Sequence, residues 1–234
     1  MDIKHSDAQD IENKIKSTLI GEPSERLTEE APKIIKELYI TPYRYFSYMF
    51  WQKGYKSIID VGCGNGYGTM IMKGFFRKVL AIDKQEKPIV INEFIQCDAT
   101  KIPVGNRKFD GIFCFETIEH NAMEEQKLIV KEINRISKRG FVIGSTNRDG
   151  PNFIEGIEIY KGSKNPYHIK ELGLKDWIEI SAKLETQGCQ IELMGSYYRK
   201  GQFIIEHISD CDLIPYCYYL LVMKREDRSY YGEV

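Results

Sequence analysis

The sequence lacks long apolar runs and closely paired cysteines. The run YYLLVM at 218–223 is strand-sized, far below the roughly 20 residues that span a bilayer. The polar opening segment MDIKHSDAQDIENK has no apolar core of a signal peptide. None of the six cysteines forms a C-x-x-C pair, and Cys97 and Cys114 sit in apolar, strand-like runs. We therefore predict a cytoplasmic protein with reduced thiols and no membrane span.

An excess of charge is also lacking. The chain has 33 Lys and Arg residues against 34 Asp and Glu residues, a formal net charge of −1. This balance provides no overall field to attract nucleic acid or an anionic membrane. The local basic stretch KEINRISKRG at 131–140 is interpreted as the solvated face of a helix. We expect no nucleic-acid partner.

Short apolar runs alternate with helical patterns from residue 56 onward. This pattern predicts strands at 56–62, 78–84, 93–99, 108–116 and 140–146, and helices at 67–78 and 124–140. Because these strands are apolar on both faces, we expect a parallel sheet covered on both sides. After residue 146 we predict a long functional loop over 147–168, a helix over 174–188, and strands over 189–198 and 216–225. The last two strands lack a clear crossover helix, which predicts an antiparallel edge.

The chain divides into three parts by pattern, without an internal repeat or a low-complexity linker. Residues 1–55 are helix-prone and are interpreted as a helical N-terminal extension, interrupted by Pro23, Pro32 and Pro42. Within it, the aromatic segment LYITPYRYFSYMFW is expected to form a lid, a pocket wall or plain core. Residues 56–225 form the main α/β domain, a size that one hydrophobic core can support, and 226–234 form a polar tail.

The most informative stretch is DVGCGNGYG, which follows the first predicted strand. A strand, a glycine-rich turn and a helix place backbone N–H groups beside a ligand. The spacing differs from the G-x-G-x-x-G fingerprint of dinucleotide-binding proteins, because neither Gly62 nor Gly64 is followed by Gly or Ala at the sixth position. Asp60 would be unfavourable beside a pyrophosphate but suits a cationic amine. S-adenosylmethionine (SAM) carries such an amine together with a carboxylate.

Two further acids follow the next strands. Asp83 ends the second predicted strand, about 20 residues on, where a carboxylate can accept hydrogen bonds from both ribose hydroxyls. Asp98 ends the third strand, where it can accept from an adenine amino group. The carboxyl ends of parallel strands line one groove. Together with the glycine spacing, these acids predict SAM as the cofactor.

The motifs IIDVGCGNGYG, LAIDK, QCDATKIP and FDGIFCFETIEH resemble those of class I SAM-dependent methyltransferases, over residues 24–224. The resemblance implies a seven-stranded, doubly wound Rossmann-like sheet whose last strand is antiparallel. It places Gly62, Gly64 and Gly66 at the methionine moiety and Asp83 at the ribose. It also places Asp98 and Ala99 at the adenine, and Phe115 and Glu116 beside the cofactor. With Asp60 and with Lys84 of LAIDK, these residues form the predicted cofactor-binding set.

A subgroup is indicated by FETIEH followed by STNRDG and NPYHIKEL. These segments, with SERLTEE and YRYF upstream, are similar to methyltransferases encoded among genes for surface carbohydrates. In that subgroup the first loop reads STPN, so Asn147 replaces its proline. The resemblance implies O-methylation of a hydroxyl on a sugar or a nucleotide-linked precursor.

The same segments resemble a second set, the ubiquinone-pathway O-methyltransferases and the plant-type small-RNA 2′-O-methyltransferases. Their E-x-x-E-H and downstream His would correspond to Glu116, Glu119, His120 and His168. In those families the carboxylates and imidazoles hold a divalent cation beside the acceptor oxygen. We expect His120 to act as the general base, oriented by Glu119, with His168 near the acceptor. The first alternative is a metal-dependent mechanism in which these residues bind a cation. The second is that the IEH segment has only a structural role.

Other functions stay open on the sequence alone. The acceptor can be a small phenolic or quinone-type molecule, or an RNA 2′-hydroxyl, although net charge argues against RNA. A non-enzyme alternative is a SAM sensor or a noncatalytic partner subunit. The complete set of glycines and acids argues against a degenerate enzyme.

Overall fold

Eight strands form one sheet in the part of the chain that the computed structural model describes, residues 33–86, 91–151, 153–158, 168–185, 188–210 and 212–224. The strands are β1 (Ser57–Val61), β2 (Lys78–Asp83), β3 (Phe94–Gln96), β4 (Phe109–Phe115), β5 (Ser137–Thr146), β8 (Cys189–Arg199), β9 (Gln202–His207) and β10 (Cys217–Lys224). Their spatial order is β3-β2-β1-β4-β5-β10-β8-β9. A separate small hairpin joins β6 (Phe153–Ile154) to β7 (Ile157–Glu158).

The first five strands are parallel and the last strand in the chain is antiparallel. β1 pairs with β2 and β4, β2 with β3, and β4 with β5, all in parallel. β10 is antiparallel to both β5 and β8. The predicted Rossmann-like order and the antiparallel last strand are therefore present. The predicted count of seven strands is wrong by one, because β9 adds an eighth at the edge.

The additional strand β9 arises from a tight hairpin. Lys200 and Gly201 separate β8 from β9, and both have positive φ angles, 48° and 82°. Two residues of positive φ match the right-handed twist of paired strands. Phe203 and Ile205 alternate as buried residues with more exposed neighbours, as expected for an edge strand with one covered face.

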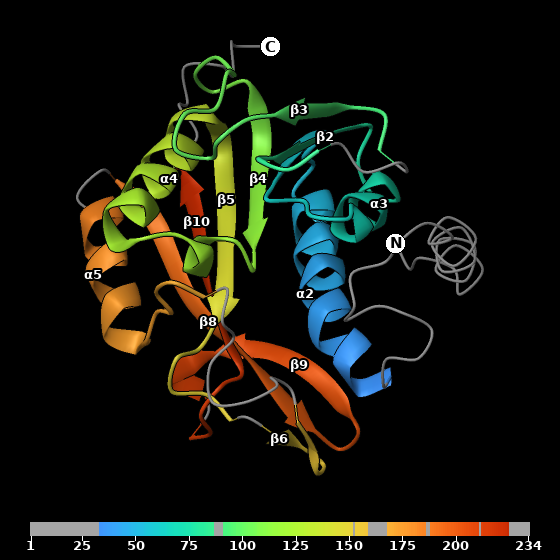
Figure 1. Ribbon diagram of the computed structural model, residues 1–234, viewed down its shortest axis with the longest axis vertical. Coiled ribbons are helices and arrows are strands. Elements are labelled where there is room, and N and C mark those ends of the chain that lie inside the picture. The colour runs from blue at the N-terminus through green and yellow to red at the C-terminus, as the bar shows by residue number, and fades with distance from the viewer. Residues whose placement is uncertain are drawn as a thin grey trace, which may run out of the picture.

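Four helices cover the two faces of the sheet among the described residues: α2 (Lys33–Gln52), α3 (Tyr67–Lys73), α4 (Met123–Ile136) and α5 (Leu174–Glu185). Figure 1 shows α2 and α3 on one side of the strands and α4 and α5 on the other. Two large apolar cores match this arrangement: one joins α2 and α3 to the sheet, and the other joins α4 and α5 to it. The doubly wound arrangement is confirmed.

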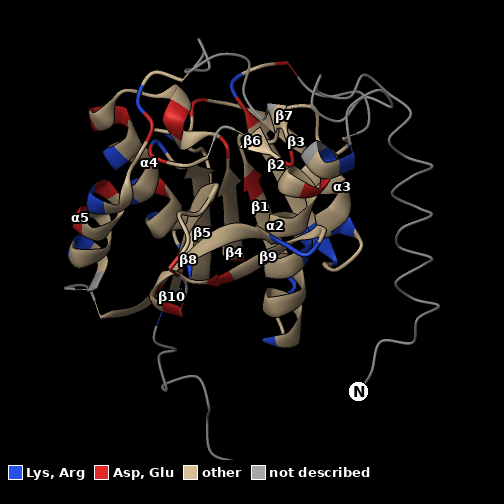
Figure 2. Cartoon of the chain, turned by 90° about the horizontal axis from the view of Figure 1, so that it is seen from below, with Lys and Arg blue, Asp and Glu red and all other residues tan. Residues whose placement is uncertain are grey.

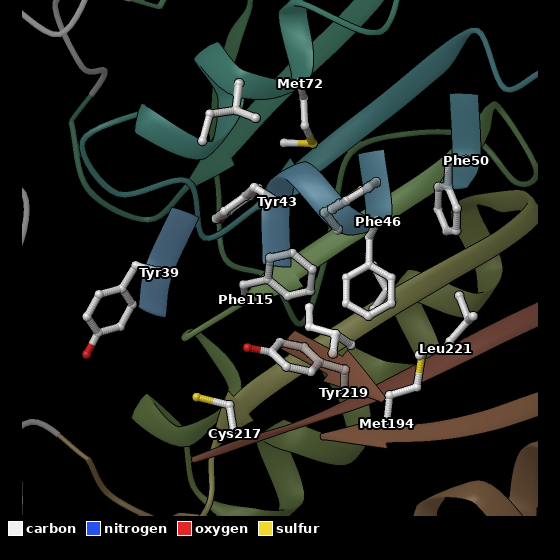
Figure 3. Close-up of a cluster of buried hydrophobic side chains, with 14 of the residues drawn as sticks. Tyr39, Tyr43, Phe46, Phe50, Met72, Phe115, Met194, Cys217, Tyr219 and Leu221 are labelled. Carbon is white, nitrogen blue, oxygen red and sulfur yellow. The ribbon is translucent and has the colours of Figure 1, made fainter. Parts of the chain in front are cut away.

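Helix α2 belongs to the core rather than to a separate extension. Its residues Tyr43, Phe46 and Phe50 are buried against Phe113 and Phe115 of β4. Figure 3 shows the rings of Tyr43, Phe46, Phe50 and Phe115 packed between the helix and the strands. The expected break at Pro42 is wrong, since α2 continues through this residue. Proline costs a helix one hydrogen bond, and burial of the neighbouring aromatic side chains offsets that cost.

Two other predicted boundaries are also corrected. Helix α4 ends at Ile136 and not at Gly140, because Ser137 is already extended and pairs with Phe109 of β4. Helix α3 ends at Lys73, capped by Gly74. Residues 1–32, residues 152 and 159–167 of the predicted loop, and the predicted tail lie outside the described residues. No described helix is both long and apolar enough to cross a bilayer.

Candidate functional site

The glycine-rich turn lies between β1 and α3, at the carboxyl end of the parallel strands. Gly62 and Gly66 have positive φ angles of 73° and 84°, a conformation that glycine adopts without a steric penalty. Gly66 is the N-cap of α3. A side chain at Gly62 would also collide with Thr117, since a Cβ atom there would lie 2.0 Å from Thr117 Oγ1. The turn therefore depends on glycine for both its backbone shape and its closeness to the end of β4.

The Asp83 carboxylate is fixed at the end of β2. Its Oδ2 accepts a hydrogen bond from the Gly64 N–H at 2.8 Å, and its Oδ1 accepts from the Gln85 N–H at 2.9 Å. A carboxylate oxygen has more than one acceptor position, so both oxygens keep capacity for a ligand. The carboxylate is thus held beside the glycine turn, as a ribose-binding acid requires.

The Asp98 carboxylate is fixed by its own loop after β3. Its Oδ1 accepts hydrogen bonds from Thr100 N–H at 2.8 Å and from Thr100 Oγ1 at 2.6 Å. These two bonds lower the pKa of Asp98 below its usual range. The ionised carboxylate is an acceptor only, which suits an amino group of a ligand.

A groove of about 560 Å³ runs along these strand ends. Eight residues of the predicted site line it: Gly62, Gly64, Asp83, Lys84, Asp98, Ala99, Glu116 and His120. Six others were missed by sequence reasoning: Ile82, Gln85, Cys97, Thr117, Asn121 and Ile169. Thr117 and Asn121 flank the IEH motif, so their position in FETIEHN was the available signal. Ile169 follows the predicted His168 directly.

The structure places Asp60 outside the groove lining. Its side chain is fully buried beneath the glycine turn and does not line the groove. The carboxylate accepts a hydrogen bond from Thr69 of α3 at 2.6 Å and one from the Tyr43 hydroxyl of α2 at 3.4 Å. Burial raises the pKa of Asp60 from 3.8 to about 7. Asp60 therefore ties two helices to β1 from outside the groove lining, and its contact with a ligand amine stays a prediction.

Phe115 and Gly66 also differ from their predicted places. The Phe115 ring points into the core beneath α2, with its centroid 4.8 Å from that of Tyr43 and 5.6 Å from that of Tyr219. Figure 3 shows this ring among the other core aromatics. Gly66 caps α3 and is not among the residues that line the groove. Strand alternation explains Phe115, since Glu116 takes the groove side of the same chain segment.

Three residues of the predicted catalytic set come together where His120 lines the groove. Glu119 and His120 belong to the short 3-10 helix η2 (Ile118–His120), which follows β4. One ligand atom from each of Glu119, His120 and His168 lies within 4.8 Å of the others. The His120 and His168 rings meet edge to face, with centroids 4.9 Å apart. One carboxylate and two imidazoles are donors that suit a first-row divalent cation, so the chemistry of this cluster fits a metal as well as a base.

Backbone contacts hold the segment after His168 against η2. The N–H groups of Ile169 and Lys170 donate to the Glu119 carbonyl at 2.9 and 3.0 Å. The buried Gln126 side chain of α4 donates to the carbonyls of Asn121 at 2.9 Å and Lys170 at 2.7 Å. The distant part of the sequence that carries His168 is thereby fixed beside the end of β4.

Glu116 lies apart from this cluster. Its backbone has a φ of 50°, and its Oε2 accepts a hydrogen bond from Thr146 at 2.8 Å. Its Oε1 faces the Cys217 thiol, with 3.8 Å between oxygen and sulfur. Glu116 is not part of the group that could share a cation. The prediction of four metal ligands is thus reduced to three in this structure.

Comparisons with known proteins agree with the fold. Residues 59–143 match a family model described as a methyltransferase domain. A probable SAM-dependent methyltransferase from Mycolicibacterium smegmatis is 26% identical over 156 residues, which cover 62% of this chain and 57% of that protein. The chain thus spans little more than half the length of this relative.

Two solved structures show the shared fold. The small RNA methyltransferase HEN1 aligns with a TM-score of 0.63 at 13% identity, over 87% of this chain and 27% of that one. The magnesium protoporphyrin IX methyltransferase from Synechocystis PCC 6803 was solved with bound SAM. It aligns with a TM-score of 0.55 at 13% identity, over 93% of this chain and 91% of that one. The prediction of SAM as the cofactor is confirmed by these comparisons. The chain therefore has the fold of SAM-dependent methyltransferases, and its residues 59–143 are similar to a methyltransferase domain.

Proposed function

We propose that the protein transfers the methyl group of SAM to a hydroxyl group of a small acceptor. The observation that carries this proposal is the position of His120. It lines the same groove as Asp83 and Asp98, and its ring contacts that of His168. A hydroxyl acceptor bound in this groove beside His120 meets an imidazole that can accept its proton.

The chemistry required of the site is modest. The sulfonium of SAM is already an activated methyl donor, so alignment of the acceptor oxygen, methyl carbon and sulfur supplies much of the rate. The oxygen attacks the methyl carbon as the carbon–sulfur bond breaks, and S-adenosylhomocysteine leaves. An alcohol also has to lose its proton, which a general base can accept. His120 takes this role in our proposal, with Glu119 and His168 beside it.

The metal-dependent alternative uses the same three side chains. Glu119, His120 and His168 would hold a divalent cation, which would stabilise the negative charge on the acceptor oxygen. The clustering of their ligand atoms within 4.8 Å supports this alternative, whereas the position of Glu116 removes one of the four expected ligands. We favour the metal-free base.

For the acceptor we propose a sugar or a nucleotide-linked precursor of a surface carbohydrate. The support is the resemblance of FETIEH and NPYHIKEL to that subgroup. A phenolic or quinone-type molecule is the second candidate, and RNA is the third. Lys and Arg alternate with Asp and Glu over α4 and α5 in Figure 2, and the formal net charge is −1. This distribution gives little support for the many phosphate contacts that RNA binding requires.

The test is methyl transfer from labelled SAM to a panel of nucleotide sugars, phenols and short RNAs, with S-adenosylhomocysteine as the common product. We expect turnover with a hydroxyl-bearing sugar compound and none with RNA. Efficient, salt-sensitive labelling of RNA would overturn the proposed acceptor. Binding of SAM without turnover on any acceptor would favour the noncatalytic alternative.

A further inference from the structure

The buried imidazole of His168 has a carboxylate partner that sequence reasoning did not assign. His168 Nδ1 lies 2.6 Å from Glu171 Oε1, within the same short segment. The His168 side chain is 2% exposed, and that of Glu171 is 20% exposed. A short contact of this kind in a partly buried place is a strong, charge-assisted hydrogen bond. It fixes both the ring plane and the proton position of the imidazole.

The contact determines which nitrogen of His168 can act on a ligand. A neutral imidazole carries its proton on one nitrogen and an acceptor lone pair on the other. A carboxylate at Nδ1 requires the proton there, because an ionised carboxylate only accepts. Nε2 then carries the lone pair. The ring that holds Nε2 meets the His120 ring at an interplanar angle of 80°, beside the Glu119 carboxylate.

We propose that Glu171 is a positioning residue for methyl transfer, which holds His168 as the Nδ1–H tautomer with the lone pair on Nε2, in a ring that packs against the ring of His120 in the groove wall. This inference rests on the proposed function for its catalytic consequence, but the tautomer itself does not. A carboxylate behind a histidine also fixes the orientation of its ring. The same arrangement serves a base, a hydrogen-bond acceptor for the substrate hydroxyl, or a ligand to a cation.

The fold of the segment does not depend on the Glu171 side chain. Its backbone is held by the Ile169 and Lys170 N–H groups on the Glu119 carbonyl, and by the Arg148 N–H on the Leu172 carbonyl. Leu172 is fully buried in the core beneath α4 and α5. Replacement of Glu171 therefore removes the partner of the imidazole and leaves the anchors of the segment in place.

The direct test is nitrogen NMR of the imidazole groups. The chain contains four histidines, so comparison with His168→Gln assigns the His168 signals. We expect a protonated Nδ1 and an unprotonated Nε2 in the wild-type protein, at a pH where the ring is neutral. In Glu171→Ala we expect the Nε2–H tautomer to appear. A wild-type His168 protonated at Nε2 would overturn the proposal, whatever the enzyme does.

Kinetics test the catalytic consequence. Glu171→Ala is expected to lower kcat by about 10–100-fold with little change in the KM for SAM, as found when partners behind histidine ligands are removed. The kcat of Glu171→Gln should lie between that of Glu171→Ala and that of the wild type. The matched control is Glu124→Gln on α4, an exposed carboxylate paired with Lys127, which should leave kcat unchanged. An unchanged kcat in Glu171→Ala would refute the positioning role. Absence of turnover in the wild type would instead refute the proposed function, while the nitrogen spectrum would still decide the tautomer.

Discussion

Asp83 and Gly64 are joined across two neighbouring strand ends, with the Asp83 carboxylate accepting the Gly64 N–H at 2.8 Å. The bond ties the acid predicted to bind the ribose to the turn predicted to bind the methionine part of SAM. One side chain thus joins two parts of the groove lining. The same carboxylate also accepts from the Gln85 N–H at 2.9 Å, which leaves it little freedom to turn.

The first prediction concerns this carboxylate. Asp83→Ala should weaken SAM binding by about 1.5–3 kcal/mol, because hydrogen bonds to a charged acceptor are lost. Calorimetric titration with SAM measures the effect. Asp83→Asn is the matched control for shape, since it keeps one acceptor oxygen. Its SAM affinity should lie between that of Asp83→Ala and that of the wild type. Equal SAM affinities in all three proteins would remove Asp83 from the cofactor site.

The second prediction compares two glycines of the turn. Both Gly62 and Gly64 have positive φ angles, 73° and 51°, so an alanine at either is expected to cost about 1–3 kcal/mol of backbone strain. Only at Gly62 would the new Cβ collide with Thr117, whereas nothing lies within 4 Å at Gly64. Gly62→Ala should therefore lower the free energy of unfolding more than Gly64→Ala. Urea denaturation measures the free energy of unfolding of both variants. Equal losses in the two would show that the turn can move away from Thr117 without cost.

The third prediction uses the buried acid Asp60. Its pKa is raised by burial from 3.8 to about 7 in the folded protein. Between these values the folded state holds a proton that the unfolded state has lost, so the free energy of unfolding falls as pH rises. The contribution is complete below pH 3.8 and is lost once the pH passes about 7. The loss is at most about 1.4 kcal/mol per pH unit.

Asp60→Asn removes this titration and keeps the size of the side chain. The stability of Asp60→Asn relative to wild type should therefore rise as the pH is raised to about 7 and level off above it. Denaturation of both proteins at a series of pH values gives the comparison. A constant difference between the two proteins across this range would contradict a raised pKa for Asp60.

The parallel half of the sheet was predictable because its signals are local. Each of β1, β2, β4 and β5 is a short apolar run, buried on both faces, next to a turn or helix signal. The hairpin that adds β9 depends on Lys200 and Gly201, a turn pair that is weaker in sequence than Asn-Gly. Helix α2 passes through Pro42 because tertiary burial outweighs a local preference. The errors are thus places where contacts distant in sequence decide the outcome.

The sequence predicted which strand ends carry the site residues, but it predicted less well where their side chains point. Asp83 and Asp98 line the groove as parallel-strand geometry requires. The burial of Asp60 away from the groove lining was not predictable, because the motif gives its place in the chain but not the face of β1 on which it lies. His168 could be placed beside His120 only by resemblance. Its actual anchors are backbone N–H groups and the Gln126 amide, which no residue pattern reveals.

The last prediction separates the two ways in which the acceptor hydroxyl can be activated. If His120 is a base without a metal, activity should survive a chelator. His120→Ala should then lower the rate by about 10²–10⁴-fold with SAM affinity little changed. His168→Ala would mainly weaken acceptor binding. If a cation is held, chelator should abolish activity, and Glu119→Ala, His120→Ala and His168→Ala should be similarly damaging.

Glu116→Gln is the control that this structure adds. Glu116 lies outside the group of atoms that could share a cation, and its Oε2 accepts from Thr146 rather than facing the two histidines. In either mechanism, the response of Glu116→Gln to a chelator should therefore match that of the wild type. We expect turnover to persist in EDTA. Complete loss of turnover in EDTA, restored by a divalent cation, would establish the metal-dependent mechanism instead. A Glu116→Gln protein that needs more cation than the wild type would show that Glu116 moves to join the cluster.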